Sequence, residues 1–475
     1  MWILNVPVHG DAGPPMIEVP MTRFALARRS RLRGLLAAAT AVLLPLLGAG
    51  LAVPGTAAAA TPDTSEPAYY DVTSPSTTAA GLAADLTRRG YDVLEGPATP
   101  GVPILATAAD AQRLRHRGLT VRYAGPLYQP VAESLRAAAG TYYGGYHTAA
   151  GHEAHNQQVA SAHPDLVVLR SIGQSWLKTQ GRGGHDIQAL CITRIKAGDC
   201  AITSTGTKPK FTLMAQMHAR ELATGELAYM WIDYLVNNYG TNADVTRLMD
   251  TTELWVIPIA NPDGVDIVSS NSNRPVSQRK NAHDNGCSGT GRGVDLNRNS
   301  SYHWDVNQGT KCSETYPGAS AASEPETQGI QDFLAGIYRD TKPSADFSPA
   351  TTDTTGTFVT LHSYAELDIY PYGWTNTLAP NNDDLRTIAT AMSQGNHYDV
   401  VHGDGGLNYF APGATDDWIY GTRGVPGYTI EVGPNTSGCS GFFPRYSCMS
   451  GFWNLNLPAF VALANAAAHP YPTGH

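Results

Sequence analysis

A histidine and a glutamate three positions apart, His218 and Glu221, have the residue types and spacing of a zinc site. They directly follow the apolar run 211–217, which is typical of a buried strand. If the chain turns into a helix there, both side chains share one face and can bind one ion. His362 ends a second apolar run and is the best candidate for a third ligand. Two histidines and one glutamate leave a coordination position open for water, as catalytic zinc requires.

Taken alone, the spacing is weak evidence. A histidine and a glutamate three apart can also pair with each other on the surface of a helix. The prediction of a metal site therefore depends on the elements and motifs that accompany the pair.

Strands and helices alternate between residues 150 and 470. Short apolar runs predict strands over 211–217, 254–259, 358–361 and 428–432. Apolar residues at helical spacing predict helices over 226–238, 324–338, 384–394 and 453–467. This alternation indicates an α/β domain with a largely parallel sheet, in which active sites lie at the carboxyl ends of the strands.

The preceding part of the chain divides into three zones. In zone 1–60, basic residues precede an apolar run, 35–53, and small residues, in the order of a secretory signal peptide. A membrane anchor is the alternative, although the run is near the lower length limit for spanning. Residues 61–135 carry short helical and extended patterns, and residues 136–150, rich in Gly, Ala and Tyr, are typical of a linker.

Composition excludes several classes of protein. Apolar residues make up 42% and charged residues 15%, which is typical of a globular chain. The net charge of −9 and the lack of a dense basic block beyond the N-terminus argue against nucleic-acid binding.

The six cysteines all follow position 190, and an even number in an exported chain favours disulfides. Many pairings and free thiols stay open, but short local spacings favour 191–200, 287–312 and 439–448.

Further motifs make residues 150–470 resemble the M14 metallocarboxypeptidases, the carboxypeptidase A-like enzymes or funnelins. Several independent motifs in one order are more specific than any one of them. The landmarks are His218–Glu221, Asn261–Gly264, Arg279, Asp295–Asn299, Ser323–Thr327, Leu361–Tyr364, Tyr409 and Tyr428–Glu431. The resemblance implies a mixed, largely parallel twisted central sheet flanked by helices in a catalytic domain over 151–470. It also implies that 61–135 is a small α/β propeptide that shields the active site until it is cleaved, for example at Arg136.

The same resemblance assigns the central chemistry. It implies one zinc ion per chain, held by His218, Glu221 and His362. Glu431 would be the general base, taking a proton from water activated by zinc. Asp295 would contact His218 and fix the tautomer of its ring.

Four further residues would bind the substrate and one would stabilise charge. Arg298, Asn297 and Tyr409 would hold the terminal carboxylate, because a guanidinium binds a carboxylate through two parallel hydrogen bonds. Arg279 would stabilise the oxyanion of the tetrahedral intermediate. Arg220 would be a secondary substrate contact, and a salt bridge at a helix start is its alternative.

Asp416 lies two residues before Trp418, where the resemblance places the base of the specificity pocket. A buried carboxylate there would pair with a basic side chain. This favours a mixed apolar and basic preference for the C-terminal residue.

The sequence thus predicts a secreted zinc metallocarboxypeptidase, made as a precursor, that acts on the C-termini of peptides and proteins. We expect a monomer, an activating protease as partner, and neither nucleic-acid binding nor stable membrane anchoring. A cell-wall peptidase that cuts peptidoglycan stems is an alternative. A non-catalytic zinc-containing binding module is another, although such a module has no use for a base or an oxyanion donor.

Overall fold

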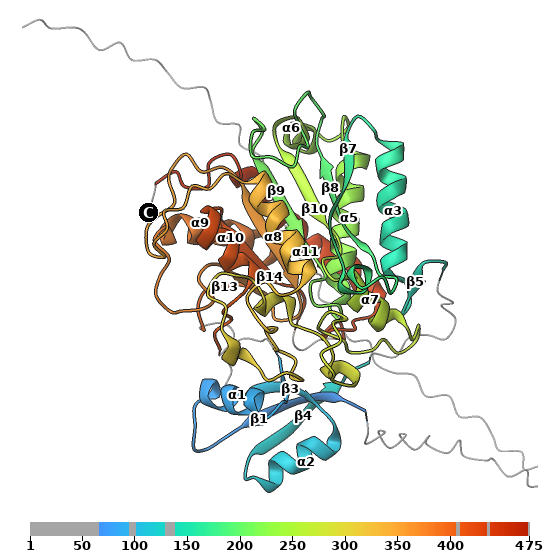
Figure 1. Cartoon of the computed structure of the whole chain (residues 1–475), viewed down its shortest axis with the longest axis vertical. Helices are drawn as coiled ribbons and strands as arrows, with labels where there is room; N and C mark the ends of the chain where they lie inside the picture. The colour runs from blue at the N-terminus through green and yellow to red at the C-terminus, as the bar shows by residue number, and fades with distance from the viewer. Residues whose placement is uncertain (1–65, 95–100, 129–137, 405–408, 435–437, 474–475) are drawn as a thin grey trace, which may run out of the picture. The chain divides into compact units, whose positions relative to one another are not determined.

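The computed structural model describes residues 66–94, 101–128, 138–404, 409–434 and 438–473 (Figure 1). Every described residue belongs to one compact unit, 62–475. The predicted signal peptide and the cleavage point at Arg136 lie outside the described residues. None of the described helices is both long and apolar enough to cross a membrane.

The N-terminal domain is a small α/β unit, as predicted. Its antiparallel sheet has the order β2-β3-β1-β4, formed by Asp92–Val93, Val102–Ala106, Ala68–Thr73 and Thr120–Pro126. Two helices accompany the sheet, α1 (Ala79–Arg88) and α2 (Ala108–His116). Thr78 and Thr107 cap these helices by accepting hydrogen bonds from backbone N–H groups of the first turn. The domain has its own apolar core, centred on Val72, Leu86, Ile104 and Leu114.

The structure differs from the linker expected over 136–150. Residues Thr141–Tyr142 (β5) and Tyr146–His147 (β6) form a hairpin, and helix α3 (Ala149–Ala162) begins directly after it. Its tyrosines are buried with 1% exposure, and burial of aromatic rings stabilises an otherwise short hairpin.

The larger, C-terminal domain is built on an eight-stranded mixed sheet. In spatial order the strands are β13 (Asp399–Val401), β12 (Leu367–Ile369), β14 (Gly427–Glu431), β11 (Thr357–His362), β9 (Lys210–Met214), β10 (Glu253–Ile257), β8 (Asp186–Ile192) and β7 (Val167–Gln174). The four central strands, β14, β11, β9 and β10, run parallel to one another. This confirms the predicted mixed, largely parallel sheet.

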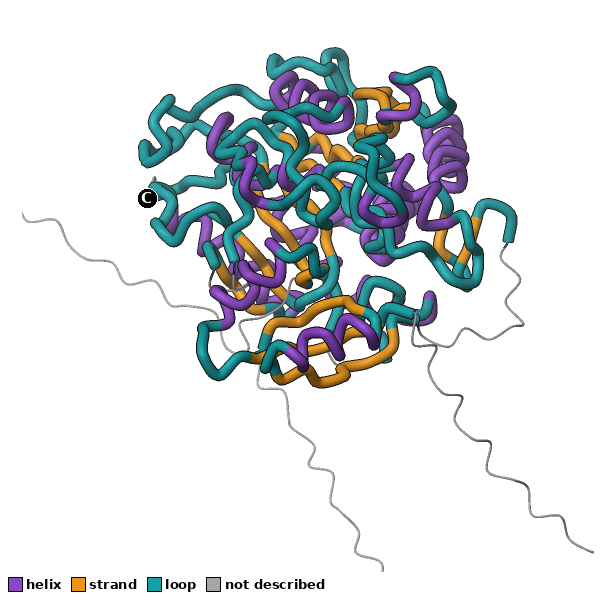
Figure 2. Tube along the Cα trace, turned by 60° about the horizontal axis from the view of Figure 1, so that its bottom comes forward, coloured by secondary structure: helices purple, strands orange, loops and turns teal. Residues whose placement is uncertain are grey.

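Helices cover both faces of this sheet, which explains why its central strands are continuous apolar runs (Figures 1 and 2). Along β10, Leu254 and Val256 face one core and Trp255 and Ile257 face the other. The first core includes residues of α5 (Leu222–Asn238), α6 (Ala243–Thr251), α7 (Pro262–Ser269), α9 (Asn382–Asn396) and α11 (Met449–Ala466). The second core includes residues of α8 (Pro325–Ile337) and α10 (Thr415–Arg423).

Short helices and three disulfides complete the domain. The short helices are α4 (Trp176–Thr179), η1 (Gly289–Gly291), η2 (Leu296–Arg298), η3 (Val306–Gln308) and η4 (Tyr446–Cys448). The disulfides join Cys191–Cys200, Cys287–Cys312 and Cys439–Cys448, which confirms the pairing favoured by local spacing.

Candidate active site

Three predicted ligands meet at the carboxyl ends of neighbouring parallel strands. His218 follows β9 by a short turn, Glu221 caps helix α5, and His362 is the last residue of β11. Nδ1 of His218 lies 2.8 Å from Oε1 of Glu221 and 3.0 Å from Nδ1 of His362. Nδ1 of His362 lies 3.2 Å from Oε2 of Glu221, and all three side chains have 0% exposure.

The local conformation differs from the expected helical face. Helix α5 begins only at Leu222, so His218 lies in the turn before it. The two residues meet because this turn folds back on itself: the N–H of Glu221 donates to the carbonyl of His218 at 3.1 Å. The helix also starts four residues earlier than the predicted 226.

The donor set fits zinc. Two Nδ1 atoms and a carboxylate converge, which are the donor types that zinc prefers. Lone pairs that face one another repel unless a proton or a cation lies between them. Burial raises the pKa of Glu221, but the charges of His218 and His362 outweigh burial and lower that pKa to about 2. The carboxylate is therefore ionised, as a metal ligand must be.

Asp295 fixes the orientation of His218. Its Oδ1 lies 3.0 Å from Nε2 of His218, which leaves Nδ1 of that ring directed at the other donors. Its Oδ2 accepts a hydrogen bond from Nε of Arg279 at 3.0 Å. Burial raises the pKa of Asp295, but Arg279 and His218 hold it far below its usual range. The predicted contact between Asp295 and His218 is therefore present.

Glu431 is the last residue of β14, the strand beside β11. It is paired in register with His362, and the N–H of Val432 donates to the carbonyl of His362 at 2.7 Å. Glu431 is 1% exposed. Topology therefore brings the predicted base next to one predicted ligand, although almost seventy residues separate them in the chain.

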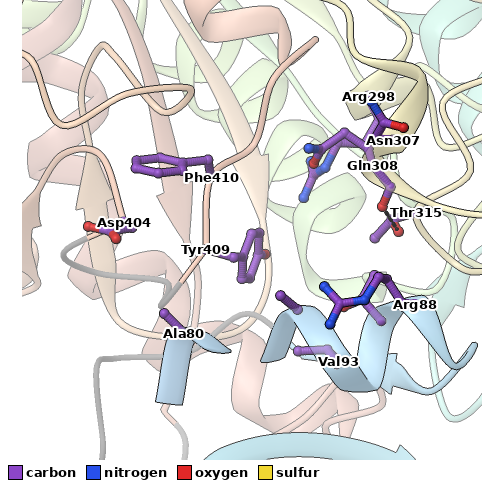
Figure 3. Close-up of a pocket in the computed structure, with 12 residues that line it drawn as sticks. Ala80, Arg88, Val93, Arg298, Asn307, Gln308, Thr315, Asp404, Tyr409 and Phe410 are labelled. Atoms are coloured by element: carbon purple, nitrogen blue, oxygen red, sulfur yellow. Dashed lines mark hydrogen bonds between the residues drawn. The ribbon is translucent and has the colours of Figure 1, made fainter. Parts of the chain in front are cut away.

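Arg298 and Tyr409 share a pocket of ≈ 400 Å³ (Figure 3). The guanidinium carbon of Arg298 lies 5.7 Å from the centre of the Tyr409 ring. Nη1 of Arg298 donates to the carbonyl of Asn297 at 2.8 Å, while Oδ1 of Asn297 accepts from the N–H of Thr415 at 3.1 Å. The pocket also has a wall from the N-terminal domain, including Ala80, Ala84 and Arg88 of α1.

Arg220 does not line this pocket. Its guanidinium donates to both carboxylate oxygens of Asp92, at 2.5 and 3.0 Å, and lies 4.1 Å from the centre of the Phe442 ring. Glu314 is the second acid at this point, 3.7 Å from Arg220. Burial raises the pKa of Glu314 to about 7, and Asp92 adds to this effect while Arg220 opposes it. In this structure Arg220 therefore holds the N-terminal domain.

Asp416 and Asp417 lie in the first turn of helix α10 and differ in their contacts. Oδ2 of Asp416 accepts from the hydroxyl of Thr429 on β14 at 3.0 Å. Asp417 accepts from the backbone N–H groups of Gly373 and Trp374 and so holds that loop. Burial raises the pKa of both carboxyl groups, most of all that of Asp417, to which Asp416 adds a like charge. Asp416 is not among the residues that line the pocket of Arg298 and Tyr409.

Sequence reasoning missed two features of the site. The first is Asp92 of the N-terminal domain, which binds Arg220. Nothing local in the sequence marks Asp92, because its partner is 128 residues away. The hydroxyl of Thr360 lies 3.2 Å from Nε2 of His362, and its position two residues before the histidine on one strand face was the available signal.

Comparisons with known proteins show the family of this chain. Residues 152–459 match the Peptidase_M14 family, described as zinc carboxypeptidase. A zinc carboxypeptidase of Saccharothrix mutabilis subsp. capreolus is 30% identical over 441 residues, covering 88% of this chain and 92% of the relative. Carboxypeptidase B2 of Homo sapiens is 27% identical over 388 residues, and the alignment covers 77% of this chain and 79% of that relative.

A solved structure shares the fold of this chain. The crystal structure of carboxypeptidase A from Helicoverpa armigera aligns with a TM-score of 0.67 at 22% identity. The alignment covers 86% of this chain and 98% of that one. This chain belongs to the Peptidase_M14 zinc carboxypeptidase family and is a metallocarboxypeptidase, a peptide hydrolase.

Proposed function

We propose that this enzyme removes the C-terminal residue of peptides with one zinc ion held by His218, Glu221 and His362. The observation that carries the proposal is the convergence of these three buried donors beside the strand end that bears Glu431. Zinc, when bound, supplies Lewis acidity that polarises the peptide carbonyl and makes water more acidic.

Glu431 takes the proton from the attacking water and later gives it to the nitrogen of the leaving amine. Arg279, oriented by Asp295, presents positive charge to the oxyanion that develops on the former carbonyl oxygen. Asp295 keeps the ring of His218 in the tautomer that directs Nδ1 at the metal position.

Arg298, Asn297 and Tyr409 bind the terminal carboxylate of the substrate. A guanidinium at the wall of a pocket gives both charge and direction, so only a chain end is accepted. Asp416 sets the preference for the terminal side chain. A buried carboxyl favours an entering basic side chain but, while protonated, tolerates an apolar one.

The N-terminal domain keeps the precursor inactive. Its helix α1 forms a wall of the Arg298 pocket. Its Asp92 accepts hydrogen bonds from Arg220, which in the mature enzyme is free to contact the substrate. An activating protease removes this domain. The chain is exported by its N-terminal segment and acts outside the cell as a monomer.

Replacement of the base tests the mechanism. Release of C-terminal Lys, Arg, Leu and Phe from blocked dipeptides is measured with and without a chelator, after removal of the N-terminal domain. Glu431→Gln is expected to lower kcat by about 10³-fold while zinc content stays unchanged. Glu366→Gln, an exposed glutamate whose N–H donates to the carbonyl of Glu431, is the matched control with full activity. Equal activity in the two variants excludes Glu431 as the base.

A further inference from the structure

A second group of histidines and a glutamate lies outside the active site. His147 ends strand β6, His152 is in the first turn of α3, and Glu226 is in the second turn of α5. Each offers one nitrogen or oxygen atom, and these atoms all lie within 4.8 Å of one another. Nδ1 of His147 is 2.9 Å from Oε1 and 3.1 Å from Oε2 of Glu226.

His152 is the residue that makes this group unusual. Its side chain is 3% exposed, and Nδ1 has no hydrogen-bond partner among the described residues. Nε2 lies 4.0 Å from Oε1 of Glu226, beyond hydrogen-bond distance. A Cβ placed on Gly225 would lie 3.5 Å from that Nε2, so the ring is directed at helix α5 beside Glu226. A buried imidazole whose nitrogens make no hydrogen bond is costly, and an ion beside Glu226 would use the lone pair of Nε2, the nitrogen that faces that carboxylate.

The other two donors are held in place. The N–H of His147 donates to Oε1 of Glu226 at 2.5 Å, and the hydroxyl of Tyr446 lies 3.5 Å from Oε2. The ring of His147 stacks on Tyr229, with the ring centres 4.3 Å apart. The His147 side chain is 21% exposed, which gives an ion a route from solvent.

The spacing of the donors fits a tetrahedral ion. Donors about 2.0–2.1 Å from such an ion are about 3.4 Å from each other. The distances from Oε1 of Glu226 to Nδ1 of His147, 2.9 Å, and to Nε2 of His152, 4.0 Å, lie on either side of this value. A hydrogen bond between His147 and Glu226 accounts for two of the three residues but leaves His152 without a role. The nearby His155 shows the contrast, because its Nε2 pairs with Asp233 at 2.8 Å.

We propose that His147, His152 and Glu226 bind a second zinc ion. The ion would join the β5–β6 hairpin and α3 to helix α5, whose cap, Glu221, is a ligand of the first ion in the proposed function. Only this last clause rests on the proposed function, because the second site shares no residue with the first. The enzyme then carries two zinc ions per chain, one catalytic and one structural.

Zinc content of the purified untagged chain tests this directly. Elemental analysis after exhaustive dialysis is expected to give about two zinc ions per chain for the wild type and about one for His152→Phe. His155→Phe removes a neighbouring buried histidine that already has a partner, and is expected to keep two. The variant that lacks both catalytic histidines, His218→Ala with His362→Ala, is expected to keep one.

Glu226→Gln retains the side-chain volume and covers the case in which His152→Phe does not fold. It too is expected to lose one zinc ion. Cobalt added to the chain without catalytic histidines should give the visible absorption of a tetrahedral ion, and Glu226→Gln should abolish it. A folded wild type with one zinc ion, together with no cobalt spectrum in the His218 and His362 variant, overturns the second site. If the catalytic site alone failed, the wild type would hold one zinc ion, His152→Phe none, and the cobalt spectrum would remain, so the two failures are distinguishable.

Discussion

At the scale of single residues, the site depends on side chains that fix one another. His218 uses one ring nitrogen for Asp295, and the other therefore faces Glu221 and His362. Asp295 in turn binds Arg279, so a single buried carboxylate orients both His218 and a cation. Such chains of contacts make the geometry sensitive to substitutions that never touch substrate.

Asp295→Asn tests this orientation. The amide cannot match the carboxylate as acceptor for both His218 and Arg279, so zinc affinity should fall by about 10–100-fold. Competition with a chelator of known affinity measures the change. Asp305→Asn, at the partly exposed N-cap of η3, should leave the zinc affinity unaltered. An unchanged zinc affinity in Asp295→Asn would show that Asp295 does not position His218.

Asp416→Ile tests specificity. Loss of the buried carboxylate should lower kcat/KM for substrates ending in Lys or Arg by about 100-fold, because a basic side chain would then lose its charged partner. The kcat/KM values for substrates ending in Leu or Phe should stay the same or rise. A parallel fall for all four substrates would instead point to damage of the Thr429 contact and the strand below it.

At the scale of elements, contacts between helices hold the frame around the sheet. His185, just before β8, lies 2.7 Å from Glu153 on α3 and 2.7 Å from Asp266 on α7. These hydrogen bonds, first that to Asp266 and then that to Glu153, raise the pKa of His185 to about 10. A protonated imidazole thus joins two helices that cover the sheet.

His185 therefore predicts a pH dependence. Its folded-state pKa exceeds the unfolded value of about 6.5, so the stabilisation is complete below that pH and is lost as pH rises through about 10. Asp266 is 52% exposed, and solvent screening limits the effect to about 1 kcal/mol. Urea unfolding of wild type and His185→Gln at pH 6 and pH 10 measures it. A difference between the two proteins that does not shrink at pH 10 contradicts the prediction.

At the scale of the whole molecule, the N-terminal domain and the catalytic domain share a buried ion pair. Arg220 is 1% exposed and makes two hydrogen bonds to Asp92, while the pocket of Arg298 is lined from both domains. Burying a charge is costly unless it is paired, so Asp92 of the N-terminal domain stabilises the buried Arg220.

Asp92→Asn should weaken this association. Breaking a buried charge pair costs about 2–5 kcal/mol, so the uncleaved chain should gain activity at least several-fold. Asp71→Asn is the control, because Asp71 pairs with Arg122 within the N-terminal domain. Hydrolysis of a blocked dipeptide by precursors shown intact by mass spectrometry provides the comparison. If Asp92→Asn is no more active than Asp71→Asn, the ion pair does not restrain the enzyme.

The sequence determined the features whose cause is local. The apolar runs predicted β9, β10, β11 and β14, and the donor types predicted His218, Glu221 and His362 as a group. Close spacing also favoured the three disulfides that the structure contains. Donor types and hydrophobic periodicity depend on residues that are close in the sequence, so they can be predicted without the fold.

Only the tertiary structure decided the contacts that join distant segments. Asp92 with Arg220, Thr429 with Asp416, and His152 beside Glu226 have no signal in sequence spacing, since each pair meets only when separate elements pack. The same reason explains why residues 141–147 form a hairpin and not the predicted linker: their tyrosines are buried only by packing against the rest of the domain. Burial is a property of the packed chain, and it determines which polar groups must find partners.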